Sequence, residues 1–221
     1  MPTTGRTFLQ TINIVLPRLR KPTVAANDTT TYSTMIGTLV NQVKTEIEYS
    51  HYWRDLRDTY TVTAVVGTTA YVFTGAGPNA QVLDGWNTTT PIKLKRGTFS
   101  DFNDKFFGVK TVATGKTEEY LVSGLNASYD LQIDIWPSPS ATNVLKFNLY
   151  VPQATLAADS TVVTIPNDVL IEGVVARALT ERGDDGGDAA KMQEQIYQRM
   201  LALAVANEKV HDPTEVNWEW V

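Results

Sequence analysis

The sequence predicts an α+β fold: a four-helix bundle-like domain, an inserted antiparallel β-sandwich or barrel-like domain, and an extended C-terminal arm. Near both ends of the chain, apolar residues recur at three- and four-residue steps, the period of an amphipathic helix. Between about residues 59 and 163 the period changes to two, as in half-buried strands. We therefore expect a helical first half at 1–56, the β domain at 57–164, a helical second half at 165–207 and the arm at 208–221.

The first two helices are predicted at 4–20 and about 32–49. Their apolar stripes are Phe8, Leu9, Ile12, Val15, Leu16 and Leu19, and then Met35, Ile36, Leu39, Val40, Val43 and Ile47. Pro17 removes one backbone hydrogen bond, so we expect it to kink or shorten the first helix. Trp53 and Leu56 are expected to pack the end of the second helix onto the core.

About seven short strands are predicted in the middle of the chain, including segments 60–65, 69–73, 91–95, 106–113 and 118–125. The clearest pattern is at 129–151. Leu131, Ile133 and Ile135 alternate with polar residues, and Leu145, Phe147, Leu149 and Val151 do the same. Pro137 and Pro139 cannot continue a strand. This segment therefore predicts two strands joined by a tight loop as a hairpin.

Two more helices are predicted after the β region. Ile165-Pro166-Asn167 precedes a third helix with the stripe Leu170, Ile171, Val174, Val175, Ala178 and Leu179. Gly183 is expected to end it, because glycine accepts the left-handed conformation of a helix cap. Asp188 is expected to cap a fourth helix that reaches Asn207, with the stripe Met192, Ile196, Met200, Leu203 and Val205. We interpret its methionines as core filler.

Composition excludes several classes of function. The net charge is −5 and the pI about 5.1, which argues against a surface built to grip nucleic acid. The absence of cysteine excludes disulfides and thiolate metal sites. The N-terminus lacks a signal-peptide layout, and no apolar run approaches the roughly 20 residues that span a bilayer. The sequence thus predicts a soluble protein.

Motifs that would carry chemistry are weak. Glu48 and His51 make at most half a metal site, and the chain has two histidines. The segment 75–79 resembles a phosphate loop but lacks the GK[ST] ending, so a turn is the better interpretation. The acidic segment 184–188 lacks the ligand register of a calcium loop. Arg182-Gly183-Asp184 is interpreted as a helix C-terminus. We therefore predict no enzyme, with no catalytic, cofactor-binding or metal-binding residues and no cofactor.

The segment after Pro213 carries the strongest binding signal. Trp218 and Trp220 alternate with polar residues, and tryptophan is enriched among interface anchors. The segment either folds back onto its own domain or docks on a partner. The candidate partner-binding residues are Val216, Trp218, Trp220 and Val221.

The order of several architectural motifs is similar to that of a known family. The motifs are Trp53-Arg54-Asp55-Leu56, Trp136-Pro137-Ser138-Pro139, Tyr150, Ile165-Pro166, Leu170-Ile171-Glu172-Gly173 and Ala178-Leu179. From about residue 7 to 207, the chain resembles the head-to-tail adaptor (connector) proteins of short-tailed bacteriophages, the tail tubular protein A and portal-adaptor group. Pro17 and the long connection at 75–104 depart from the family pattern.

The resemblance implies a structural virion protein, made in the host cytoplasm and located at the head–tail junction. It implies a ring of twelve copies beneath the portal protein, continuing the DNA channel without specific DNA binding or a membrane contact. The tail nozzle and possibly tail fibres would dock on it, with the helical part facing the portal and the arm reaching the portal or a neighbouring subunit. The alternatives are a carbohydrate-binding, adhesin-like β domain and a cell-wall hydrolase with two carboxylates in a cleft.

Overall fold

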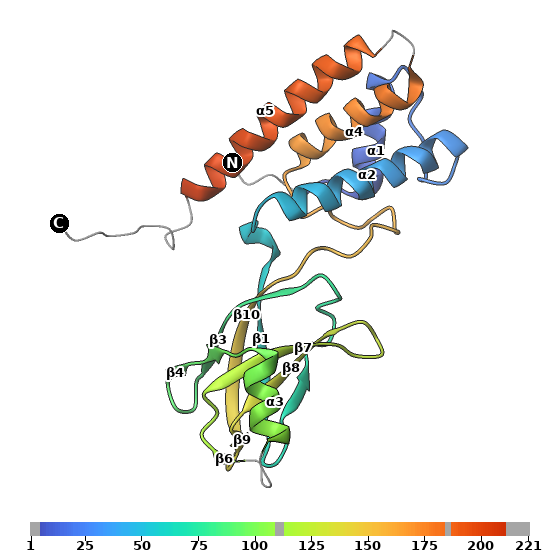
Figure 1. Ribbon diagram of the computed structural model, residues 1–221. Helices are drawn as coiled ribbons and strands as arrows, with labels where there is room; N and C mark the ends of the chain where they lie inside the picture. Colours follow the sequence, from blue (N-terminus) through green and yellow to red (C-terminus); the bar gives the residue numbers. More distant parts are fainter. Residues whose placement is uncertain (1–4, 109–112, 184–186, 211–221) are drawn as a thin grey trace, which may run out of the picture. The chain divides into compact units, whose positions relative to one another are not determined.

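The computed structural model describes residues 5–108, 113–183 and 187–210. The chain divides into two compact units, a helical unit formed by Met1–Leu56 and Gln153–Val221 and a β unit formed by Arg57–Pro152 (Figure 1). The fold is therefore mixed α+β, with five helices and several sheets among the described residues.

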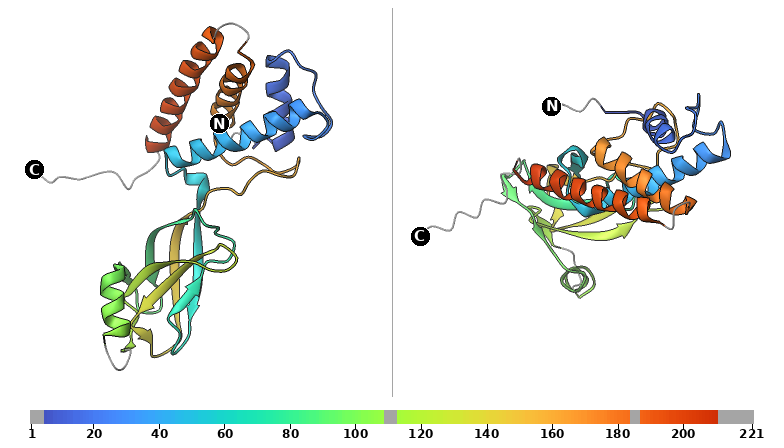
Figure 2. Two further views of the ribbon diagram at one scale, coloured as in Figure 1. Left: turned by 45° about the vertical axis from the view of Figure 1, so that its right-hand side comes forward. Right: turned by 90° about the horizontal axis from the view of Figure 1, so that it is seen from above.

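Four helices build the helical unit: α1 (Phe8–Arg18), α2 (Thr31–Ser50), α4 (Asn167–Arg182) and α5 (Asp188–Val210). A single 3₁₀ turn, η1 (Arg54–Leu56), follows α2. Helix α4 packs against α1, α2 and α5, and Figure 2 shows it lying between α1 and α5. The outer faces of α1 and α5 consequently belong to opposite sides of this unit.

The ends of the helices follow from local sequence chemistry. Thr7 and Thr30 each accept a hydrogen bond from the backbone N–H three residues on, in a capping box. Pro17 lies in the last turn of α1, which ends at Arg18, two residues before the predicted end. Gly183 caps α4 with a φ of 63°, as predicted.

The core of the helical unit consists of the predicted stripes. The buried side chains include Phe8, Ile12, Val15, Leu16, Ile36, Val40, Val43, Ile47, Leu170 and Val174. The Trp53 side chain is 3 % exposed, and its indole N–H donates to the Ile47 carbonyl oxygen at 2.7 Å, which confirms that it packs the end of α2 onto the core. Gly173 lets α4 approach its neighbours closely, since a Cβ there would lie 2.6 Å from Val43 Cγ1 and 2.9 Å from the Tyr197 ring.

Two four-stranded sheets form the β unit. The first has the order β1-β10-β3-β4, made of Arg57–Ala64, Asn143–Tyr150, Gln81–Asn87 and Ile92–Lys93, all antiparallel. The second has the order β2-β8-β7-β5, made of Ala70–Val72, Leu131–Trp136, Glu119–Leu125 and Lys95–Arg96, with β5 parallel to β7. A short parallel pair joins β6 (Thr114–Gly115) to β9 (Ser138–Pro139).

The two sheets bury side chains in one shared core. The Phe147 ring of β10 contacts the rings of Phe73 and Tyr120 at centroid distances of 5.2 and 5.4 Å, although these two residues belong with the other sheet. Ile133 and Ile135 of β8 are fully buried in the same cluster. The alternation seen in the sequence therefore marks the buried face correctly on both strands.

The predicted hairpin at 129–151 is wrong. Strand β8 pairs with β2 and β7, whereas β10 pairs with β1 and β3, so the two strands lie in different sheets. The connection between Trp136 and Asn143 carries the chain from one sheet to the other. Alternation fixes which side chains are buried, but the same pattern suits any partner strand.

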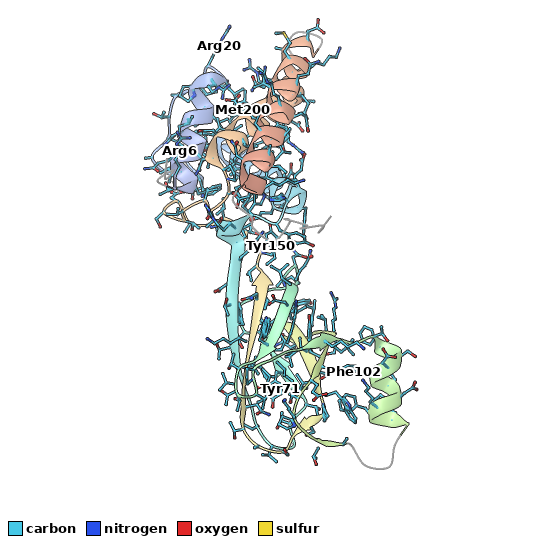
Figure 3. The ribbon with its side chains drawn as sticks, turned by 90° about the vertical axis from the view of Figure 1, so that its left-hand side faces the viewer. Arg6, Arg20, Tyr71, Phe102, Tyr150 and Met200 are labelled. Atoms are coloured by element: carbon cyan, nitrogen blue, oxygen red, sulfur yellow. The ribbon has the colours of Figure 1, made fainter. Side chains whose placement is uncertain are left out.

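The strand predicted at 106–113 is also wrong where the structure describes it. Phe106 and Phe107 end a helix, α3 (Phe99–Phe107), and residues 109–112 lie outside the described part of the chain. Thr98 caps this helix by accepting a hydrogen bond from the Asp101 N–H at 3.3 Å. Phe102 is 2 % exposed on the side of α3 that faces the strands (Figure 3), and the Phe106 ring contacts that of Trp136 at 5.4 Å.

Candidate interaction surfaces

The residues considered as half a metal site have other partners. The Glu48 carboxylate is 2 % exposed and accepts hydrogen bonds from Lys44 Nζ at 3.0 and 2.9 Å and from the Gln153 N–H at 3.0 Å. Burial raises the pKa of the Glu48 carboxyl, and the bonds from Lys44 and Gln153 oppose that shift. Within 5–108, 113–183 and 187–210, no three His, Asp or Glu side chains are grouped to hold a metal ion.

The same buried pair fixes the segment that returns from the β unit. Lys44 Nζ also donates to the Gln153 carbonyl oxygen at 2.6 Å. One turn earlier on α2, the Asn41 amide donates to the Leu156 carbonyl oxygen at 3.0 Å and accepts from the Leu156 N–H at 2.8 Å. Polar side chains of α2 therefore hold the backbone at 153–156, which is a structural role rather than a catalytic one.

The glycine-rich segment at 75–79 forms a turn, as interpreted from the sequence. The N–H groups of Gly75 and Gly77 donate to Asp130 Oδ1 at 3.0 and 3.2 Å. A carboxylate already occupies these two donors, so they are not available to a phosphate group.

A cleft of about 440 Å³ opens in the helical unit beside the start of α4. It is lined by Gly5, Trp53, Arg54, Asp55, Glu208 and the segment 162–168. Its carboxylates have partners: Asp168 accepts from Arg6 at 2.8 Å, Glu208 accepts from the Arg54 N–H at 2.8 Å, and Asp55 lies 3.7 Å from Arg54. These contacts link separate segments of the helical unit.

Helix α5 presents a second surface, because most of its apolar side chains are not buried. Ala190 and Tyr197 face the rest of the unit, whereas Met192, Ile196 and Leu203 are 67, 45 and 55 % exposed. We refer to these three exposed residues as the outer stripe. The interpretation of Met192 as core filler is therefore wrong, and Met200, labelled in Figure 3, is only half-buried.

Tyr197 attaches α5 to the unit. Its ring is 1 % exposed and packs beside Gly173, and its hydroxyl donates to Glu46 Oε1 at 3.3 Å. Burial raises the pKa of the Tyr197 hydroxyl, and the neighbouring Glu46 carboxylate raises it further. The hydroxyl is therefore a neutral donor at any physiological pH.

A groove of about 400 Å³ lies between α5 and the end of α2. Its walls are Ser50 of α2 and residues Gln198, Leu201, Ala202, Val205, Ala206 and Lys209 of α5. The two alanines lie one turn apart and leave a depression between larger neighbours. The sequence contains the signal for this surface, because apolar residues occur on more than one face of α5, but the predicted stripe assigned all of them to the core.

The candidate partner-binding residues Val216, Trp218, Trp220 and Val221 lie outside the described residues. They follow directly on the end of α5, where the groove is located. The candidate partner-binding residues therefore remain a prediction.

The comparisons with known proteins identify the family. None of the described helices is both long enough and apolar enough to cross a bilayer. No curated protein matches the chain. A family model described as SU10 adaptor protein matches residues 6–216, so the match spans both units. The chain therefore belongs to the SU10 adaptor family, whose members are structural adaptor proteins of bacteriophages.

Proposed function

We propose that this protein is the head-to-tail adaptor of a short-tailed phage and forms a ring of twelve copies beneath the portal protein. The ring continues the DNA channel of the portal and carries the tail nozzle and, through it, tail fibres. The observation that carries the proposal is the family match over residues 6–216, which includes the helices and the inserted β unit together.

Each part of the chain has a place in this proposal. The helical halves at 1–56 and 165–207 form a four-helix bundle-like domain that faces the portal. The β unit, Arg57–Pro152, is a sandwich directed towards the tail, and the arm that follows α5 reaches the portal or a neighbouring subunit. Packing of two sheets around one core supports the sandwich, and the exposed apolar face of α5 supports a subunit that associates.

The charge of the chain suits a channel through which DNA slides. With 24 acidic and 19 basic residues, the net charge is −5. A wall without a basic stripe does not retain the phosphate backbone, since each neutralised phosphate would add affinity. The ring therefore needs no specific contact with DNA.

The carbohydrate-binding alternative requires several exposed aromatic side chains in one groove. The exposed aromatic residues described in the β unit are Trp86 on β3, Phe99 and Phe107 on α3, and Tyr129 before β8. They come from three different elements, and we do not propose a glycan site on them.

Binding to the portal tests this function. Sedimentation velocity of the purified protein mixed with the portal assembly of the same phage should show a saturable complex at micromolar concentration. Replacing Trp218 and Trp220 together by alanine should weaken binding at least tenfold, because we propose both as interface anchors. The matched control is Trp86→Ala in the β unit, which should bind like the unchanged protein. Absence of a complex for the unchanged protein would refute the proposal.

A further inference from the structure

Strand β1 is the longest open edge of the two four-stranded sheets. Their outer strands are β1, β4, β2 and β5. In the described part of the chain, β4 and β5 have two residues each and carry basic side chains, and β2 has three residues. Strand β1 has eight residues, pairs with β10 without a register shift and has its two charged residues, Arg57 and Asp58, at its start. Short length and basic residues protect an edge strand from pairing with another chain, and the part of β1 after Asp58 has neither.

The pairing of β10 shows which backbone groups of β1 point outwards. The Val144 carbonyl oxygen of β10 accepts a hydrogen bond from the Thr88 N–H, just beyond β3, at 2.9 Å. The backbone groups of Val144 therefore face β3, and its register partner on β1 is Thr63. The N–H and C=O groups of Thr63 consequently point away from β10. By the alternation of a strand, those of Thr61 and Thr59 do the same.

Two hydrogen bonds limit the open part of this edge. The Thr59 N–H donates to Asp58 Oδ1 at 2.7 Å, and the Val65 N–H donates to the Tyr71 hydroxyl at 2.9 Å. Two further outward N–H groups lie between these ends and have no hydrogen-bond partner among the described residues, those of Thr61 and Thr63. The side chains of both residues are exposed. An extended strand from another chain can therefore reach these donors.

The open part is complementary to a second copy of itself. Residues 59–63 read Thr-Tyr-Thr-Val-Thr, which is nearly the same in both directions. In an antiparallel pair centred on Thr61, the Thr61 N–H donates to the Thr61 carbonyl oxygen of the second copy. The Thr63 N–H donates to the Thr59 carbonyl oxygen of the second copy, and the two-fold axis repeats both bonds. The open donors of both copies thus find acceptors, while the Thr59 N–H keeps its bond to Asp58.

The side chains in this register also match. Tyr60 lies opposite Val62 of the second copy on the inner face, and the axis creates this pair twice. Val62 is 8 % exposed, and Tyr60 packs against the same apolar core, so the two pairs extend that core. Pairs of an aromatic with a β-branched residue, and of threonine with threonine on the outer face, are favourable across strands.

The neighbouring registers are less favourable. A pair centred on Tyr60 would place the Asp58 carboxylate opposite Val62 on the inner face. A pair centred on Val62 would replace both tyrosine–valine pairs by Tyr60 opposite Ala64. The register centred on Thr61 avoids both, and it brings no two like charges directly opposite each other.

We propose that two copies of this protein pair through the open edge of β1, antiparallel and with the two-fold axis at Thr61. The two sheets then continue as one sheet of eight strands. The contact is isologous and stops at two copies, so it is a different surface from the heterologous contacts of a ring and goes beyond the proposed function. A single strand pair is small beside the roughly 1,200–2,000 Å² that stable interfaces bury, so pairing is expected at about 0.1 mM protein and above, not at micromolar concentration.

Disulfide formation tests the register, because the chain has no cysteine of its own. In the proposed pair the two Thr61 Cα atoms are about 5.5 Å apart, within the range of a disulfide. The two Thr63 Cα atoms are more than about 13 Å apart, since each lies four residues from its own counterpart. Under mild oxidation at about 0.1 mM, Thr61→Cys should form a disulfide-linked dimer at least tenfold faster than the matched control Thr63→Cys, which lies on the same exposed face.

Sedimentation equilibrium between about 10 µM and 1 mM tests the association itself. The unchanged protein should shift from monomer towards dimer. Thr61→Lys should weaken association at least tenfold, because two lysines would face each other across the axis. Its side chain is exposed, so the change is compatible with folding. The control Thr38→Lys adds the same charge on α2 and should associate like the unchanged protein.

Three results would each overturn the proposal: a monomer at 1 mM, equal oxidation rates for the two cysteine variants, or equal association of Thr61→Lys and the unchanged protein. Neither experiment contains portal protein. Failure of the β1 pair therefore leaves the proposed function untouched, and failure of portal binding does not affect this test.

Discussion

The buried ion pair on α2 is the residue-scale feature with the largest expected effect on stability. Lys44 and Glu48 are 2 % exposed each and hold each other and the backbone of Gln153. Removing one partner leaves the other charge buried without compensation, which costs about 3–5 kcal/mol. We expect Lys44→Met to lower the free energy of unfolding by that amount in urea denaturation.

The matched control for this prediction is Lys191→Met on α5. Lys191 lies 3.4 Å from Asp188, and both side chains are largely exposed. Exposed pairs contribute about 0–1 kcal/mol, so this control should change stability little. Equal losses for Lys44→Met and Lys191→Met would show that burial of the first pair does not matter.

Close packing at Gly173 gives a second prediction. A methyl group there would lie 2.6 Å from Val43 Cγ1 and 2.9 Å from the Tyr197 ring. Overpacking of this kind costs about 1–3 kcal/mol. Gly173→Ala should therefore lower the urea midpoint. Gly115→Ala, where an added Cβ meets nothing within 4 Å, should leave it within error of the unchanged protein. A Gly173→Ala midpoint equal to that of the control would contradict the close packing.

At the scale of elements, one polar cluster joins three helices. The Arg18 guanidinium of α1 donates two hydrogen bonds of 2.7 Å to the Glu172 carboxylate of α4, which also accepts from the Gln193 amide of α5. The bond from Arg18 lowers the pKa of the Glu172 carboxyl below its ordinary value near 4.5, burial opposes the shift, and Gln193 adds to it.

The acid stability of the helical unit follows from this lowered pKa. A carboxyl whose pKa is lower in the folded state contributes stability above its unfolded pKa, and this contribution is lost as the pH falls through the folded pKa. We expect Glu172→Gln to lower stability at pH 7 by about 1–2 kcal/mol and to make the loss between pH 5 and 3 shallower. The control is Glu194→Gln. The measurement is the urea midpoint of each variant between pH 7 and pH 3. An unchanged slope for Glu172→Gln would be the contrary result.

The sequence patterns predicted the positions of the helices better than they predicted which strands pair with each other. The helices α1, α2, α4 and α5 occur close to the predicted positions, because capping residues and apolar periodicity are local signals. The pairing of β8 and β10 was predicted incorrectly, since the connecting segment does not reveal which sheet the next strand joins. Helix α3 was missed because its nine residues contain phenylalanines that suit a strand equally well.

The candidate site shows a similar limit. Alternating tryptophans are a signal that can be read locally from the sequence, whereas the exposure of Met192, Ile196 and Leu203 depends on which face of α5 packs against α4. The face of α5 that packs against the unit is the one that carries Tyr197. Its neighbours there, Gly173 and Glu46, lie far away in the sequence. Periodicity alone cannot distinguish the two apolar faces of such a helix.

At the scale of the whole molecule, each unit should respond separately to a local defect. The chain divides into two compact units, and the β unit has its own apolar core. Such units often open as separate cooperative blocks. In hydrogen exchange with mass spectrometry, Gly173→Ala should speed exchange in peptides of α2, α4 and α5 and leave those of β8 and β10 unchanged. Equal acceleration in both units would show that they unfold together.

The central claim is that copies of this protein close into a ring on the portal, and native mass spectrometry tests it most directly. The purified protein would be measured alone and after mixing with the portal assembly of the same phage. We predict monomers alone and, on the portal, one saturated complex that carries twelve copies, because heterologous contacts close only at a fixed number of subunits. No complex at micromolar concentration, or an open series of increasing copy numbers, would contradict the account.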